Sequence, residues 1–194
     1  MKKFNLTMIL MIISALGFID RSYAQKQSKG LYLTYNDYLN HKLSYSTDPG
    51  NPGKNIINIH EFIGQKSVTV ISNGKKQVIP KSDLFGYHDH GNDYRFYDNI
   101  AYQIIDTAGF CIYSFDKLVQ QGKGPRPTRV YYFSKKTDTE LLPLTAENIA
   151  RAFPKNHKFR FMVEVEAKAD LKLDAYDGVS NEYKIKELYT ESLK

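Results

Sequence analysis

The sequence predicts an α+β fold, in which an antiparallel β meander or a partly closed barrel is followed by C-terminal helices packed on it. Apolar and polar residues alternate between turn residues from about 55 to 143, as expected for sheet strands. From about 145 to 192 the apolar spacing becomes helical. We expect one globular domain over 25–194, because the helices have too little apolar surface to stand alone.

Residues 1–24 have the pattern of a secretory signal peptide. Two lysines precede an apolar run over Phe4–Ile19, and Ser22-Tyr23-Ala24 provides small residues where a signal peptidase reads the chain. The alternative is an uncleaved anchor, for which the run is short. No cysteine ends the run, so lipid attachment is not expected. We therefore expect an exported, soluble chain, periplasmic or secreted, with no transmembrane segment after cleavage.

The first predicted elements lead into a hairpin. Thr34, with Asp37 three residues later, fits a capping box for one or two helical turns. In the segment 67–79, the pair Asn73-Gly74 suits the positive φ angles of a tight hairpin turn. The other elements expected before residue 81 are a turn-rich connection over 41–54 and a strand over 55–62.

The most regular signals lie between residues 81 and 115, which we expect to organise the sheet. Gly86 suggests a bulge or close packing. A single cysteine, Cys111, cannot form an internal disulfide and is expected to be a small buried apolar residue. The expected elements are strands over 85–87, 94–97, 100–105 and 110–115, with a polar loop over 88–93.

The C-terminal part is predicted to contain three helices. The segment 158–169 is ambiguous, because its phenylalanines and valines alternate as in a strand but also fit one helical stripe. We favour a helix there, since it lies between two clearer helices. The elements expected after residue 119 are a long loop over 120–127, a strand over 128–133, a helix with Thr145 as its N-cap and Pro154 as its end, the helix over 158–169 and a helix over 177–192.

One cluster has the residue types of a metal site. His88 and His90 would point to the same side of a strand, and Asp93 could supply a third ligand for a zinc ion. The alternative is a polar hairpin loop in which Gly91 provides turn geometry. Metal binding at His88, His90 and Asp93 is therefore a hypothesis, and no cofactor is expected.

Aromatic and basic side chains give a second candidate site. Tyrosines on a sheet can stack on a sugar ring or a base, although they more often fill the sheet itself. Cations in the 120–129 segment could meet a phosphate, a lipid head group or an acidic glycan, or could simply be solvated. The candidate ligand-binding residues are Tyr87, Tyr94, Tyr97, Lys123, Arg126 and Arg129.

Several stretches resemble a family of small exported Bacteroidota proteins of unknown function. They include Gly30–Tyr38, Lys81–Tyr87 with Asp93–Tyr97, Leu142–Asn148 and Tyr183–Leu188. The resemblance implies export, one domain and helices after the sheet, including a helix over 158–169. It implies no activity, cofactor or site residues.

The sequence favours a non-catalytic envelope or secreted binding module over an enzyme. It contains no nucleophile elbow, phosphate-binding glycine loop or HExxH helix. The alternative is a small secreted hydrolase or metal-dependent enzyme that uses the His88–Asp93 segment. Export argues against a nucleic-acid partner, although the formal net charge is +6. Self-association through exposed tyrosines is a third hypothesis.

Overall fold

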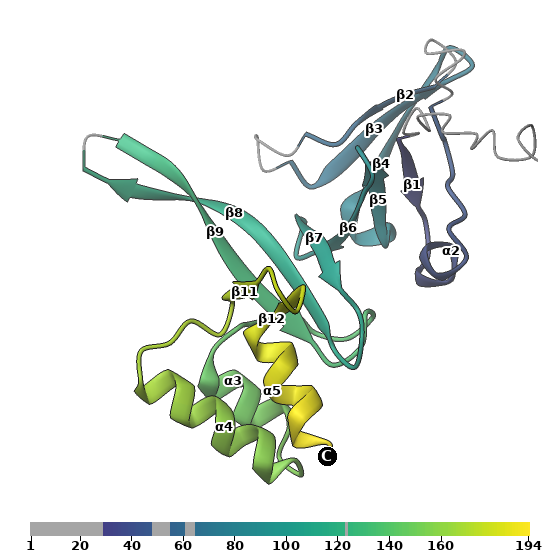
Figure 1. Ribbon diagram of the computed structural model, residues 1–194. Helices are drawn as coiled ribbons and strands as arrows, with labels where there is room; N and C mark the ends of the chain where they lie inside the picture. Colours follow the sequence, from purple (N-terminus) through teal and green to yellow (C-terminus); the bar gives the residue numbers. More distant parts are fainter. Residues whose placement is uncertain (1–28, 48–54, 61–64, 123) are drawn as a thin grey trace, which may run out of the picture.

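The computed structural model describes residues 29–47, 55–60, 65–122 and 124–194 (Figure 1). The predicted signal peptide, most of the turn residues of the first connection and Lys123 lie outside these residues. The predicted α+β class is confirmed, because antiparallel sheets are followed by the main helices. The sheet is not closed into a barrel. Within the described residues, no helix is long and apolar enough to cross a membrane.

A seven-stranded antiparallel sheet runs through the molecule in the order β1-β5-β6-β7-β8-β9-β10. From β5 to β9 the neighbours follow in chain order, so the predicted meander is confirmed. The short strand β1 pairs with β5 and forms one edge of the sheet. The strands are β1 (Gly30–Tyr32), β5 (Gly86–Asp89), β6 (Asn92–Tyr97), β7 (Ile100–Asp106), β8 (Cys111–Gln121), β9 (Gly124–Ser134) and β10 (Leu142–Pro143).

A second sheet contains β2 (Asn55–Asn58), β3 (Ser67–Ser72) and β4 (Lys75–Pro80). The predicted hairpin is confirmed, and both turn residues, Asn73 and Gly74, have positive φ angles of 50° and 75°. A short 3₁₀ helix, η3 (Lys81–Asp83), then leads to β5. The N-terminal core between the sheets consists of Leu31, Ile57, Ile59, Val68, Val70, Leu84, Tyr87 and Phe96.

The part of the chain that the structure describes contains four α-helices, and both predicted N-caps are present. The Thr34 hydroxyl accepts from the backbone N–H of Asp37 in a full capping box, and the Thr145 hydroxyl accepts from the backbone N–H of Asn148 without the reciprocal bond. The helices are α2 (Tyr35–Leu39), α3 (Ala146–Ala152), α4 (His157–Lys168) and α5 (Lys184–Ser192). The last three pack on β8 and β9 to form the helical core, which consists of Phe110, Ile112, Phe133, Ile149, Phe159, Val163, Leu173, Ile185 and Leu188.

Both cores lie on one face of the seven-stranded sheet. Tyr94, which packs on the N-terminal core, lies opposite Gln103, and Gln103 lies opposite Ser114. Ser114 is two residues from Ile112 of the helical core. Opposite residues, and residues two apart, share a face of a sheet. That face is therefore covered by the second sheet at one end and by helices at the other (Figure 1).

A buried lysine joins the last helix to the sheet. The side chain of Lys186 on α5 is 3% exposed, and its ammonium group donates to the carbonyl oxygens of Ala108 and Phe110. It also lies 3.3 Å from a carboxylate oxygen of Asp106. Burial lowers the pKa of Lys186, and these acceptors offset the cost of burying the charge.

The structure settles the ambiguous C-terminal segment and corrects the helix that follows it. The favoured helix over 158–169 is confirmed as α4. The predicted helix over 177–192 is wrong in its first part, where β11 (Tyr176–Asp177) and β12 (Glu182–Tyr183) form a small hairpin. The Asp177 carboxylate accepts from the backbone N–H of Val179, and Val179 is 93% exposed rather than part of an apolar stripe.

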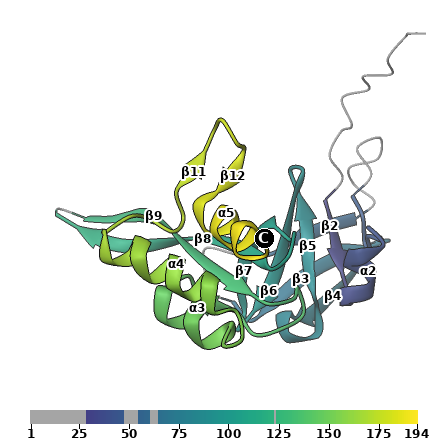
Figure 2. The same ribbon diagram turned by 60° about the horizontal axis from the view of Figure 1, so that its bottom comes forward.

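Two predicted loops are largely strand. The segment 88–93 forms the end of β5 and the start of β6, and only His90 and Gly91 form the turn, with φ angles of 48° and 77°. The described residues of the segment 120–127, apart from Gly122, lie at the ends of β8 and β9. These two strands form a ribbon whose outer end projects away from the rest of the sheet (Figure 1, Figure 2). A tight turn at His90-Gly91 therefore replaces the first expected loop, and the described residues of the second are mostly strand.

The structure also explains Gly86, which the sequence marked as a site of close packing. A Cβ atom at this position would lie 1.8 Å from the carbonyl oxygen of Tyr94 on the neighbouring strand. We predict that Gly86→Ala lowers the free energy of unfolding by roughly 3 kcal/mol, because β5 and β6 must move apart. Urea denaturation measures the change. Gly124→Ala is the control, since its Cβ would meet nothing within 4 Å. Equal stability of the two variants would contradict the prediction.

Candidate functional site

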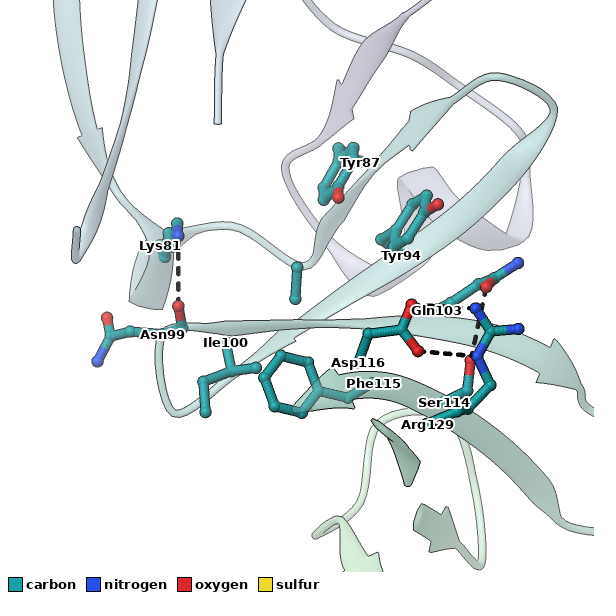
Figure 3. A pocket seen from close by; sticks show the side chains of 11 residues that line it. Lys81, Tyr87, Tyr94, Asn99, Ile100, Gln103, Ser114, Phe115, Asp116 and Arg129 are labelled. Carbon is teal, nitrogen blue, oxygen red and sulfur yellow. Dashed lines mark hydrogen bonds and ion pairs between the residues drawn. The ribbon is translucent and has the colours of Figure 1, made fainter. Parts of the chain in front are cut away.

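A pocket of about 410 Å³ lies where β7 and β8 diverge (Figure 3). The two strands pair at Gln103 and Ser114, whereas the start of β7 pairs with β6 alone among the described residues. The volume falls in the range of small-molecule sites, about 300–1,000 Å³. The pocket is lined by Lys81, Tyr87, Tyr94, Asn99, Ile100, Ala101, Gln103, Ser114, Phe115, Asp116 and Arg129.

Two stacked tyrosines form one side of this pocket. Tyr87 on β5 and Tyr94 on β6 lie directly opposite each other, with ring centroids 4.5 Å apart and planes 3° apart. Tyr87 is only 1% exposed and supports the more exposed ring of Tyr94. The pair therefore presents a flat aromatic surface whose orientation is fixed by the sheet.

Polar side chains lie beside the rings. The Gln103 amide donates to the Asn92 side-chain oxygen at 2.9 Å, which fixes the orientation of Gln103. The Ser114 hydroxyl donates to the side-chain oxygen Oε1 of Gln103 at 3.5 Å. Both side chains come from the same row of the sheet as Tyr94, because the register places the three residues opposite one another. The pocket thus combines an aromatic surface with hydrogen-bonding groups.

The charged groups of the pocket have partners within the chain. Arg129 makes two hydrogen bonds to the Asp116 carboxylate, at 2.9 and 3.0 Å. The hydrogen bond from Arg129 lowers the pKa of Asp116, so this carboxylate stays ionised at neutral pH. The Lys81 ammonium group donates to the Asn99 carbonyl oxygen at 3.3 Å and lies 5.4 Å from the centroid of the Phe96 ring. Each charged side chain that lines the pocket therefore already has a partner within the chain when a ligand arrives.

The structure brings three of the six predicted ligand-binding residues together. Tyr87, Tyr94 and Arg129 line the pocket. Tyr97 lies on the opposite face of β6 and contacts Arg95, whose guanidinium carbon is 5.4 Å from the centroid of the Tyr97 ring. Arg126 lies farther out on β9, opposite Val119, and Lys123 is outside the described residues.

Sequence reasoning missed Gln103, Ser114, Asp116 and Lys81 as pocket residues. Gln103 and Ser114 could have been found only from the strand register, which places Gln103 opposite Tyr94 and Ser114 opposite Gln103. A wider hollow of about 690 Å³ lies near Lys135, Phe153 and Tyr189, but none of the predicted site residues lines it.

The proposed metal ligands divide into two separate pairs. His88 Nδ1 lies 2.7 Å from Asp93 Oδ1, and the same oxygen accepts a 2.8 Å hydrogen bond from the Tyr32 hydroxyl. His90 lies in the turn, 87% exposed, and pairs with Asp89 instead. Within the parts of the chain that the structure describes, no three His, Cys, Asp or Glu side chains gather as a metal site. Metal binding stays a prediction.

Cys111 is buried, as predicted. It is 2% exposed, and its sulfur lies 3.2 Å from the hydroxyl oxygen of Thr137. It belongs to a third cluster, on the face of the sheet opposite the two cores, with Tyr102, Tyr113 and Leu141. The thiol therefore serves in packing rather than at the pocket.

Buried tyrosines give the protein a defined alkaline limit. Burial, followed by the hydrogen bond to Asp93, raises the pKa of Tyr32, and burial raises the pKa of Tyr102 to about 12. The phenols of the unfolded chain ionise near pH 10. The contribution of the neutral, buried tyrosines to the free energy of unfolding is therefore complete below that pH and is lost as the pH rises further.

We predict that the free energy of unfolding of the native chain falls as the pH rises from about 10 to about 12, and that Tyr32→Phe makes the fall shallower. Urea denaturation at a series of pH values measures both slopes. Identical slopes for the native chain and the variant would show that Tyr32 does not contribute.

Comparisons of this chain with models of protein families, with curated proteins and with solved structures gave no match. The candidate site is therefore defined by its geometry, with the pocket at Tyr94 first and the His88–Asp93 pair second.

Proposed function

We propose that this chain is an exported, non-catalytic binding module that holds a small, uncharged, ring-bearing ligand in the pocket at Tyr94. The observation that carries this proposal is the stacked Tyr87–Tyr94 pair beside Gln103 and Ser114, in one pocket of suitable volume. Export rests on the signal-peptide pattern of residues 1–24.

The lining indicates the chemistry of the ligand. A flat aromatic surface favours the face of a sugar ring or a base, since stacking gives roughly 1–3 kcal/mol for each base. The amide of Gln103 and the hydroxyl of Ser114 can exchange hydrogen bonds with hydroxyl or amide groups. A charged ligand would have to compete with the Asp116–Arg129 pair, so an uncharged ligand fits better.

The same lining argues against catalysis in this pocket. Asp116 is the only carboxylate among the described lining residues, and both its oxygens accept hydrogen bonds from Arg129. General acid–base catalysis uses a group that can take and give a proton near neutral pH. The lowered pKa of Asp116 removes it from that role.

Binding tests this proposal directly. Neutral monosaccharides and nucleosides are added to the purified chain, and chemical-shift changes are followed by NMR. We predict that at least one of them binds, and that Tyr94→Ala weakens its binding roughly ten- to hundredfold through loss of stacking. Tyr97→Ala is the matched control, because Tyr97 lies on the same strand but on the opposite face.

Gln103→Leu gives a second test that leaves the tyrosine stack in place. It removes the hydrogen-bonding amide and should weaken binding of the same ligand, with little change in the fold as judged by circular dichroism. The proposal fails if no compound of the panel binds, or if Tyr97→Ala reduces binding as much as Tyr94→Ala does.

The alternative is a secreted hydrolase or metal-dependent enzyme that uses the His88–Asp93 segment. The 2.7 Å contact between the His88 ring and the Asp93 carboxylate favours it, because a carboxylate commonly orients a catalytic or metal-bound imidazole. We predict that, if this alternative holds, the purified chain carries stoichiometric metal and a His88→Ala/His90→Ala variant does not. Elemental analysis decides the metal-dependent form of this alternative, and a metal-free chain of unchanged stability would rule that form out.

A further inference from the structure

The outer part of strand β8 has an open edge. The strand runs to Gln121, but its pairing with β7 ends at Ser114. Beyond that point its only partner among the described residues is β9. A strand with one unpaired side presents a row of backbone N–H and C=O groups to which another chain can pair.

The register shows which residues face this open edge. The carbonyl oxygen of Tyr131 accepts a hydrogen bond from the backbone N–H of Leu144. The backbone N–H and C=O groups of the odd-numbered residues of β9 therefore point away from β8. In an antiparallel pair, the backbone groups of two opposite residues either point toward each other or both point outward. The partners on β8 that lie opposite these positions therefore have N–H and C=O groups that point away from β9. Those partners are Asp116, Leu118 and Gln120, whose N–H and C=O groups point out of the ribbon.

The two edges of the ribbon differ in their ability to pair. Pro125 and Pro127 lie at outward-facing positions of β9, opposite Gln120 and Leu118. Proline has no N–H, so these residues block strand addition along β9. β8 has no proline, and Leu118 is 68% exposed beside its open edge. Only the β8 side of the ribbon can accept a further strand.

Charge indicates the kind of strand that fits. The outer ribbon carries three described cations, Lys117, Arg126 and Arg129, and one described anion, Asp116, which pairs with Arg129. The other two cations, Lys117 and Arg126, lie on the same face of the ribbon. Arg126 lies opposite Val119, and Val119 shares a face with Lys117 because the two are two residues apart on β8. A second copy would bring the same charges and be repelled, whereas acidic side chains opposite these positions are favourable.

We propose that the β8 edge binds an extended, acidic peptide segment of another protein as an added antiparallel strand over Asp116–Gln120. The backbone groups of Asp116, Leu118 and Gln120 supply the hydrogen bonds, and Lys117 and Arg126 select acidic side chains. Of the three residues that supply these bonds, only Asp116 also lines the pocket at Tyr94. The added strand uses its backbone groups, so the proposal does not depend on the function of that pocket.

The test uses the purified chain and a short peptide that alternates glutamate and valine, with an alternating lysine–valine peptide as the control. Hydrogen exchange followed by NMR should show fast exchange at the amides of residues 116, 118 and 120 in the free chain. The acidic peptide should slow exchange at these three amides, while Lys117 and Val119 are protected throughout by β9.

Variants test the same bonds. Gln120→Pro removes one outward-pointing N–H and should weaken binding of the acidic peptide about five- to tenfold. Pro125 lacks the corresponding N–H on the facing strand. Gln120→Thr keeps the N–H and should bind as the native chain does. Arg126→Glu should shift the preference toward the lysine–valine peptide.

Three results would overturn the proposal. The first is no binding of the acidic peptide at about millimolar concentration. The second is equal binding of both peptides, or binding that leaves the three amides exchanging fast. The third is protection of those amides that rises with protein concentration alone, which would identify a second copy as the partner.

Discussion

The covered face of this protein depends on the register of one antiparallel meander. Tyr87 opposite Tyr94, Tyr94 opposite Gln103 and Gln103 opposite Ser114 form a single row across four strands. A shift of one residue would turn that row to the opposite face and would also remove apolar residues from a core. Close contact at Gly86 and the tight turn at His90-Gly91 hold the register. Core packing and the pocket thus share one constraint.

Strand β8 is longer than the stretch of it that pairs with β7, and this mismatch creates both surfaces discussed above. Because the two strands part after Gln103 and Ser114, the sheet opens into the pocket at Tyr94. Because β8 continues with β9 alone, the ribbon keeps one open edge. A ligand in the pocket and a strand on the ribbon would therefore lie close to each other, at Asp116, without using the same groups.

The sequence was sufficient for the α+β class, the meander, the Asn73-Gly74 hairpin and the caps at Thr34 and Thr145. Each of these depends on neighbours in the chain, whose spacing and turn chemistry can be read directly. The loops predicted over 88–93 and 120–127 were wrong because polar residues, glycine and proline also occur in strands that have an exposed side or edge.

The pocket was predicted only in part, for a different reason. Tyr87, Tyr94 and Arg129 were recognised by residue type, but Gln103 and Ser114 carry no signal of their own. Their role follows from pairing across the sheet, which requires the register of four strands at once. Tyr97 has the same side chain as Tyr94 and lies on the other face, so composition alone could not separate them.

The buried ammonium group of Lys186 has a consequence for the order of folding. It contacts carbonyl oxygens that precede it by 76 and 78 residues, whereas the strands of the meander pair with near neighbours in the chain. Contacts distant in sequence carry a larger loop-closure entropy and form later than local ones. We therefore expect the meander to assemble first and α5 to dock late, closing the apolar face of the helical core.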